Sequence, residues 1–409
     1  MAGRSTAQRE ALGDARRIVV KVGTRVLVDA NGRPDPARLS NLTNQIAALR
    51  SEGREIVLVS SGAIAAGLEA LGLKRRPTHL PGLQMTAAVG QSRLVAHYAQ
   101  LFATRGVNVG QVLLTHEDLK NRRRHLNARN TMMALLRHGV VPIVNENDVV
   151  SVDEIRFSDN DHLASLVALL VDADLLLLLT KVDGVKRPLG TRPTGGRPPT
   201  SQTTRRPPTK PARQRYQRVG YIDRVTDEVI AWSWGEVSGL TLGGMRLKLQ
   251  AAQTAAEAGV AVVIADGRKP TVLHDIVAGH DTGTLIGVAD TKDQPLSSRK
   301  RWIAFFHRPD GGLIVDDGAR DALQRSGRSL LPIGIRGVEG TFRAGALVRV
   351  KDGEGQVIAR GLVAYSSADI QQIMGRATND VAQILGAKPY DEVIHRDNIV
   401  LAAPTRGPW

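Results

Sequence analysis

Short apolar, β-branched runs alternate with amphipathic segments of helical period through the first two-thirds of the chain. Arg17–Val22 is such a run, and the next segment places Leu39, Leu42 and Ile46 on one helical face. Two parallel strands need a long crossover between them, which is usually a helix. The repeated alternation therefore predicts an α/β fold, with helices on both faces of a mainly parallel sheet.

The other expected elements continue this alternation. Further strands are predicted at 56–59, 107–114, 140–144, 173–180 and 260–265. Helices are predicted at 63–71, 83–103, 126–139 and 244–258, with another that Ser158 would cap. The longest apolar stretch, 163–179, is interrupted by Asp172 and Asp174, which a membrane span would not carry at its centre. That stretch is expected to form a helix, a turn and a buried strand.

Near Trp302 the pattern of the sequence changes to short runs of β-forming residues separated by glycine. These runs, at 311–319, 329–335, 346–352 and 355–365, predict a separate, mainly β domain. A chain of 409 residues also exceeds what one core usually serves. The predicted parts are an N-terminal tail (1–16), the α/β domain (17–289), a linker (290–310), the second domain (311–389) and a C-terminal tail (390–409).

The formal charge of +15 is concentrated in one segment. Ten Lys or Arg, no acid and seven of the nineteen prolines lie between Lys186 and Arg218, which leaves about +5 for the rest. This stretch has no apolar periodicity, so a basic Pro/Arg-rich insert at 186–218 with an extended, mobile loop is expected. Such a loop can attract RNA or phosphate, but a tolerated solvated insert is the simpler interpretation.

Composition and missing motifs exclude several function classes. The absence of cysteine rules out disulfides, thiolate zinc sites and cysteine nucleophiles. The N-terminus lacks the apolar core of a signal peptide, so a cytoplasmic location is expected. The chain has no P-loop, no G-x-G-x-x-G, no G-x-S-x-G elbow and no H-E-x-x-H, which disfavours Walker ATPases, Rossmann dehydrogenases, serine hydrolases and zinc enzymes. No protein-bound metal is predicted.

Polar residues and glycines follow nearly every predicted strand. Lys21 ends the first strand, Ser61-Gly62 the second, Asn145 to Asp148 the fourth, and Thr180-Lys181 the long apolar run. In a parallel sheet these ends meet at one edge, where ligands bind. Glycines before a helix let N–H groups approach an anion, and the stretch from Gly243 to Lys248 opens such a helix. Two lysines meeting there would suit phosphoryl transfer, although each signal alone is weak.

With these residues in view, the sequence resembles the glutamate 5-kinase family of the amino acid kinase superfamily. The resemblance covers about 18–398 and is carried by VVKVGT, SSGAIAAG, AAVGQSRL, GQVLLT, LNARNT, PIVNENDVV, DNDHLASLVA, LLLLT, GGMRLKLQAA, SRKRWI and SLLPIGI. It implies an amino acid kinase fold, a three-layer α/β/α sandwich, followed by a small, mainly β PUA-like barrel. It also implies ATP-dependent phosphorylation of the side-chain carboxylate of L-glutamate to L-glutamyl 5-phosphate, the first step of proline biosynthesis.

The resemblance assigns roles to residues of this chain. Lys21 and Lys248 are implied to stabilise the transferred phosphoryl group, and Asp161 to orient both lysines. The residues implied to bind glutamate are Ser61, Gly62, Asn145, Asp148, Asp159 and Asn160. Those implied to bind ATP are Lys21, Thr180, Lys181, Leu242, Gly243, Gly244, Met245, Arg246, Leu247 and Lys248, with Mg²⁺ held through the nucleotide phosphates.

The chain departs from the family pattern on the nucleotide side. It has Thr180-Lys181 where the family usually has Thr-Asp, and Leu242 to Lys248 where the family has a GTGGM-x-TK segment. The basic insert stands in place of a further nucleotide-side segment. These departures remove hydroxyl contacts near the phosphates. Our hypothesis is that Arg246 and arginines of the insert bind phosphate instead, which an unchanged Michaelis constant for ATP in Arg246→Ala would refute.

The resemblance also implies homo-oligomers and feedback inhibition by proline, and an interaction with the next enzyme of the proline pathway is a further hypothesis. No membrane partner is expected. One alternative is an impaired kinase homologue that binds RNA or regulates through the PUA-like domain and the insert. Against it, the residues of the reaction centre are all present. A second alternative is a sister kinase acting on acetylglutamate, aspartate, carbamate or a nucleotide, but the NEND and DND segments favour glutamate.

Overall fold

The computed structural model divides the chain into two units, each described here by itself. The first unit comprises Met1–Thr115 and Arg129–Ala289, and the second comprises His116–Ala128 and Asp290–Trp409. The structure describes residues 2–29, 32–150, 160–189, 215–235, 244–288, 298–305, 309–386 and 390–402.

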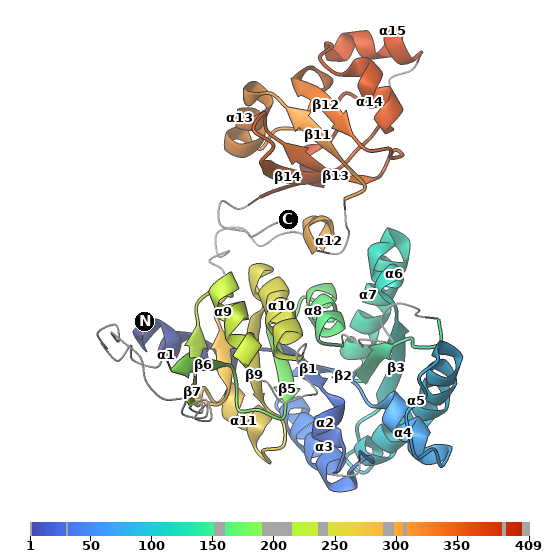
Figure 1. Cartoon of the computed structure of the whole chain (residues 1–409), viewed down its shortest axis with the longest axis vertical. Coiled ribbons are helices and arrows are strands. Elements are labelled where there is room, and N and C mark those ends of the chain that lie inside the picture. Colours follow the sequence, from blue (N-terminus) through green and yellow to red (C-terminus); the bar gives the residue numbers. More distant parts are fainter. Residues whose placement is uncertain are drawn as a thin grey trace, which may run out of the picture. The chain divides into compact units, whose positions relative to one another are not determined.

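An eight-stranded sheet forms the centre of the first unit (Figure 1). In spatial order its strands are β3 (Val109–Leu114), β4 (Val141–Glu146), β2 (Glu55–Ser60), β1 (Arg17–Val22), β5 (Leu175–Thr180), β9 (Ala261–Asp266), β10 (Thr284–Ile286) and β8 (Tyr221–Ile222). Neighbouring strands are parallel except β9 and β10, which are antiparallel. The prediction of a mainly parallel α/β sheet is confirmed.

Helices cover both faces of this sheet because its central strands are apolar on both faces. In β1, Val19, Val20 and Val22 are all fully buried. Burial of each such side chain stabilises the folded state by about 1.5–3 kcal/mol relative to leaving it in water. The core on one face joins alternate residues of β1 to the three helices α3 (Pro36–Ser51), α5 (Leu80–Ala103) and α11 (Val272–Val277). The other face contacts α8 (Asn160–Leu170), which lies beside α10 (Gly244–Glu257) (Figure 1).

The residues at the start of α3 explain why this helix begins where it does. Asp35 caps α3, and its Oδ1 accepts hydrogen bonds from the N–H groups of Ala37 (3.0 Å) and Arg38 (3.2 Å). Pro36 takes the first helical position, where no N–H is needed. The remaining elements of this unit are α1 (Ala2–Glu10), α2 (Thr24–Leu27), α4 (Ala63–Ala70), the end of α7 (Arg122–Arg137), β6 (Lys186–Leu189), β7 (Arg215–Arg218), α9 (Asp227–Ala231) and the 3₁₀ turns η1 (Ala11–Asp14) and η2 (Trp232–Gly235).

The N-terminal residues differ from the tail that the sequence predicted. They form α1 and η1, and Arg9 is only 5% exposed. Its guanidinium donates to the carbonyls of Gly220 (2.7 Å) and His280 (2.9 Å) and pairs with Asp281 (2.9 Å). These partners lie more than 200 residues away, so no local pattern could have revealed them.

The ends of the basic insert are ordered as a hairpin rather than a loop. Strands β6 and β7 pair antiparallel from Lys186 opposite Arg218 to Leu189 opposite Arg215. The extended loop predicted between them lies in 190–214, outside the described residues.

The second unit contains a sheet of five strands. Their order is β12 (Ile335–Glu339), β11 (Gly311–Val315), β13 (Leu347–Lys351), β14 (Val357–Leu362) and β15 (Ile399–Leu401). Its helices are α6 (His116–Lys120), the start of α7 (Arg122–Arg137), α12 (Ser298–Phe305), α13 (Asp317–Ser326), α14 (Ser367–Ile373) and α15 (Val381–Leu385), with the 3₁₀ turns η3 (Pro332–Gly334), η4 (Thr378–Asp380) and η5 (Arg396–Asn398).

Four details of this unit differ from the elements that the sequence predicted. The predicted linker contains α12, whose Trp302 is 4% exposed and donates to the carbonyl of Leu119 (3.3 Å). The predicted C-terminal tail contributes β15, which pairs with β14. The run 329–335 holds η3 rather than a strand, because Pro332 lacks a donor and has a fixed φ. The helices α13, α14 and α15 interrupt a region that we expected to be mainly β.

Candidate active site

The parallel strands of the first sheet end at one edge, and their alternation decides which helix layer each end residue faces. Val20 and Val22 of β1 belong to the core beneath α5, so Lys21 points to the opposite face, toward α8. In β2, Leu58 belongs to that same core, so Ser60 points to α5 and Ser61 follows on the other side. Lys21 and Ser61 therefore both lie on the face of the sheet that α8 covers.

A carboxylate between two lysines lies at this edge. Asp161 is 6% exposed in the first turn of α8. Its Oδ1 lies 2.7 Å from the Nζ of Lys21, and its Oδ2 lies 2.7 Å from the Nζ of Lys248 on α10. Burial alone would raise the pKa of Asp161, but the two ammonium groups and their hydrogen bonds hold it below its ordinary value. The carboxylate is therefore ionised at neutral pH and fixes both lysines.

The three side chains together carry one net positive charge in a nearly buried position. Lys21 is 5% exposed, and the Lys248 side chain is 12% exposed. A low-dielectric setting strengthens the attraction of such a cluster for an anion. Holding two ammonium groups at a fixed spacing suits the charge spread over the oxygens of a transferring phosphoryl group.

A second, neutral cluster lies next to this one and consists of Ser61, Asn145 and Asn160. We call it the amide cluster. Asn160, which precedes Asp161, donates through Nδ2 to the hydroxyl of Ser61 (2.8 Å) and to Oδ1 of Asn145 (3.0 Å). Asn160 and Asn145 are 4% and 2% exposed. The ends of β2 and β4 are thereby tied to the start of α8, and the two clusters adjoin at residues 160 and 161.

The turn after Ser61 depends on a glycine. Gly62 has φ +118° and ψ 0° and precedes the first residue of α4. This left-handed conformation is costly for any residue with a Cβ. A Cβ built there would meet no atom within 4 Å, so the constraint is on the backbone rather than on space.

Asp148 lies in the turn after β4. Burial raises its pKa to about 6, and the nearby charge of Arg76 offsets part of that effect. Within the described part of the chain, no hydrogen bond joins Asp148 to the amide cluster. Among the described residues, Asp148 is therefore not part of the hydrogen-bonded cluster of Ser61, Asn145 and Asn160.

The predicted nucleotide side is described only in part. Thr180 ends β5, Lys181 is exposed beyond it, and Gly244, Met245, Arg246 and Leu247 form the first turn of α10. Leu242, Gly243 and Asp159, together with the proposed cap Ser158, lie outside the described residues. Sequence reasoning missed Arg268, which donates to the carbonyl of Lys181 (2.7 Å) and pairs with Asp266 (2.7 Å) at the end of β9.

Two residues of α5 were also missed, although the segment AAVGQSRL had been singled out. Gln91 accepts a hydrogen bond from Asn145 (2.7 Å), and Tyr98 bonds the hydroxyl of Ser60 (2.9 Å). They are seven residues apart, so they share one face of the helix. The spacing could have been noticed, but it looks the same as that of an ordinary buried helix face.

No acidic or histidine cluster suited to a metal ion occurs among the residues that the structure describes. Both oxygens of Asp161 lie against lysine nitrogens, so that carboxylate is already engaged. The cationic cluster suits an anionic ligand such as a phosphate group.

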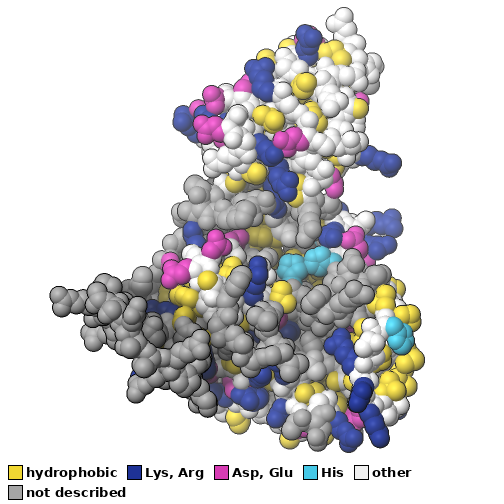
Figure 2. Space-filling model, viewed as in Figure 1, with side chains coloured by type: hydrophobic (Ala, Val, Ile, Leu, Met, Phe, Trp, Pro, Cys, Tyr) yellow, Lys and Arg dark blue, Asp and Glu magenta, His cyan; other side chains and the backbone are white. Residues whose placement is uncertain are grey.

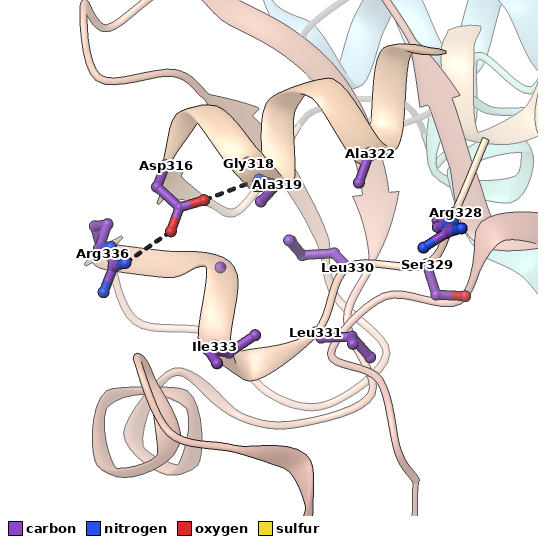
Figure 3. Close-up of a pocket in the computed structure, with 11 residues that line it drawn as sticks. Asp316, Gly318, Ala319, Ala322, Arg328, Ser329, Leu330, Leu331, Ile333 and Arg336 are labelled. Atoms are coloured by element: carbon purple, nitrogen blue, oxygen red, sulfur yellow. Dashed lines mark hydrogen bonds and ion pairs between the residues drawn. The ribbon is translucent and has the colours of Figure 1, made fainter. Parts of the chain in front are cut away.

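The second unit holds a recess of about 300 Å³, shown in Figure 3. Asp316 there caps α13 through the N–H of Ala319 (2.8 Å) and pairs with Arg336 (2.8 Å), while Leu331 and Ile333 supply apolar walls. The carboxylate of Asp316 is already engaged by these two contacts, so the carboxyl edge of the first sheet is the stronger candidate for the active site.

No helix in the described part of the chain is both long enough and apolar enough to span a membrane.

Two parts of the chain match known families. The amino acid kinase family matches residues 16–190, and the PUA domain matches residues 311–385. The fold and the site thus define a kinase of the amino acid kinase class that carries a PUA domain.

Three full-length relatives refine this assignment. The glutamate 5-kinase of Citrifermentans bemidjiense is 45% identical over 96% of this chain and 100% of its own length. That of an Azoarcus species is 45% identical over 96% and 100%, and that of Myxococcus xanthus is 44% identical over 96% and 98%. The chain belongs to the glutamate 5-kinase family.

Proposed function

We propose that Lys21, Asp161 and Lys248 form the centre with which this glutamate 5-kinase transfers the phosphoryl group of ATP to the side-chain carboxylate of L-glutamate. The observation that carries the proposal is the single buried carboxylate that holds one lysine from β1 and one from α10, each at 2.7 Å. Phosphoryl transfer needs mostly positioning and charge stabilisation, which two fixed ammonium groups supply.

The amide cluster is the proposed glutamate side of the site. Ser61, Asn145 and Asn160 offer neutral donors and acceptors beside the lysines, and such groups bind carboxylates without exchanging a proton. The carboxylate of Asp148 would bind the α-ammonium group of glutamate. Gly62 and Asp159 complete the proposed substrate set.

The first turn of α10 and the end of β5 are the proposed nucleotide side. Helix N–H groups there favour phosphate, and Lys248 adds a charge. Thr180, Lys181, Leu242, Gly243, Gly244, Met245, Arg246 and Leu247 are proposed to line MgATP. The metal, held by the phosphates, would supply further charge neutralisation.

The chemistry requires no general base. The attacking group, the glutamate side chain, is already ionised at neutral pH, since its ordinary pKa is near 4.3. One of its oxygens forms a bond to the γ-phosphorus, the bond from that phosphorus to the leaving oxygen of ADP breaks, and L-glutamyl 5-phosphate and ADP result. This is the first step of proline biosynthesis.

An RNA-binding role finds little support in the structure. Among the described residues on the face shown in Figure 2, Lys and Arg side chains are interspersed with acidic and neutral ones rather than gathered in one basic surface. The comparisons also favour the kinase. We also propose a cytoplasmic location, homo-oligomers, feedback by proline and contact with the next enzyme of the pathway.

The test is formation of an acyl phosphate by the purified protein with ATP, Mg²⁺ and L-glutamate, trapped with hydroxylamine as the hydroxamate. Hydroxamate should depend on glutamate, and Lys248→Ala should lower kcat by at least about 10²-fold, because it removes a charge that stabilises the transition state. Lys120→Ala is the matched control, since among the described residues that lysine pairs with exposed Glu117. A folded protein that forms no hydroxamate, or a Lys248→Ala variant as active as Lys120→Ala, would contradict the proposal.

A further inference from the structure

Helix α5 lies unusually close to α4 because glycines occupy their crossing. A Cβ on Gly90 would lie 1.7 Å from the carbonyl oxygen of Ala63, and one on Gly67 would lie 1.9 Å from that of Thr86. No residue other than glycine fits at either place without movement. Gln91 directly follows Gly90, so this close approach fixes its backbone relative to the strand ends.

Gln91 is the first member of a directed series of hydrogen bonds. Its Oε1 accepts from Nδ2 of Asn145 (2.7 Å), Oδ1 of Asn145 accepts from Nδ2 of Asn160 (3.0 Å), and Asn160 donates again to Ser61 (2.8 Å). The series crosses the carboxyl edge of the sheet from α5 on one face to α8 on the other. Because a carboxamide has an oxygen on one side and a nitrogen on the other, the first bond dictates how the next amide is turned.

Within the part of the chain that the structure describes, two atoms of this series are buried without a partner. They are Nε2 of Gln91 and Oδ1 of Asn160, on side chains that are 9% and 4% exposed. Buried polar groups are normally hydrogen-bonded, and leaving one unbonded is costly unless a ligand or water supplies the partner. Of the two, the acceptor Oδ1 of Asn160 belongs to the side chain that donates to Ser61 and precedes Asp161, so a ligand bound beside them can supply its missing donor.

We propose that Gln91 is a positioning residue for glutamate, a role that rests on the proposed function of the site. By accepting from Asn145, it turns the Asn145 oxygen toward Asn160, which leaves the Asn160 oxygen and the Ser61 hydroxyl oriented for the substrate. It acts through Asn145 and does not touch the lysines, so it governs the binding of glutamate and not of ATP.

The experiment is a double-mutant cycle on the full chain, with Gln91→Met and Asn145→Ala alone and combined. Methionine has a similar length but makes no amide hydrogen bond. Gln91→Met should raise the KM for glutamate roughly tenfold or more while the KM for ATP changes less than about twofold. The double variant should bind glutamate no worse than Asn145→Ala, because both changes break the same series.

Controls separate this proposal from folding defects and from the proposed function. Ser92→Ala, on the exposed side of the same helix, should match the wild type. If Gln91→Met does not fold, Gln91→Leu, which also lacks the acceptor for Asn145, should raise the KM for glutamate with the KM for ATP unchanged. Fully additive effects in the cycle, or an unchanged KM for glutamate, would overturn the role of Gln91. A wild-type protein that forms no hydroxamate would instead contradict the proposed function.

Discussion

The two halves of the site depend on different kinds of interaction. The proposed phosphoryl half consists of full charges, whose attraction depends weakly on direction; its residues are Lys21, Asp161 and Lys248. The proposed glutamate half is neutral and depends on which atom donates and which accepts; its residues are Ser61, Asn145, Asn160 and Gln91. Charge suits the centre where negative charge is transferred, whereas direction suits the recognition of one amino acid among several.

The halves are adjacent in the chain as well as in space. Asn160 belongs to the amide cluster and Asp161 to the charged one, and both lie in the first turn of α8. Neighbouring substitutions can therefore separate the chemical step from substrate recognition. If the comparison is sound, residue 161 should control kcat and residue 160 the KM for glutamate.

The largest effect is expected from Asp161→Asn. The change is nearly isosteric but leaves two buried ammonium groups without their shared carboxylate, so both lysines should move apart. We expect kcat to fall about 10²- to 10³-fold with a small change in the KM for glutamate. Steady-state kinetics by the hydroxamate assay would measure this. A raised KM for glutamate at unchanged kcat would show that the halves are not distinct.

Asn160→Ala should have an intermediate effect of the opposite kind. It removes the donor shared by Ser61 and Asn145, and a lost buried hydrogen bond corresponds to a rise of roughly tenfold to a hundredfold in KM. The same assay with glutamate varied at saturating ATP gives this value. The KM for ATP provides the internal control, because a change in it would indicate a general disturbance of α8.

The smallest effect concerns pH and sharpens the glutamate half. Burial raises the pKa of Asp148 to about 6, so the fraction ionised falls as pH drops through that value. Only the carboxylate attracts the α-ammonium group, hence the KM for glutamate should rise about twofold between pH 8 and pH 6, and about tenfold by pH 5. Asp148→Asn should show a high KM that no longer varies over this range. A retained pH dependence in that variant would assign the titration to another group.

Local patterns were sufficient for six of the eight strands of the first sheet, whereas the short strands β8 and β10 were not predicted. Strands such as β1 and β5 are continuous apolar runs, and the structure has them close to the predicted limits. The expectation that polar strand ends would share one edge also agrees with the contacts of Lys21, Ser61 and Asn145. The catalytic and binding roles of these residues stay predictions.

Contacts between distant segments could not be predicted in this way. Arg9 is buried by carbonyls near residues 220 and 280, and its own neighbours in sequence suggest only an exposed charged stretch. Gln91 sits on a helix face whose spacing is that of any core helix, and its partner is a strand end elsewhere in the chain. The short β15 became a strand only because β14 offered an edge to it. In each case the deciding interaction is tertiary.

The position of β1 in the sheet has a consequence for how the protein is made. This strand lies between β2, which follows it closely, and β5, whose Leu175 pairs with Ile18 across most of the first unit's sequence. During synthesis from the N-terminus, the second edge of β1 stays open until β5 has left the ribosome, and long-range parallel pairing is slow. Strand β1 therefore gains its second neighbour only after β2, β3, β4 and β5 have been made, and its apolar edge remains exposed to aggregation in the meantime.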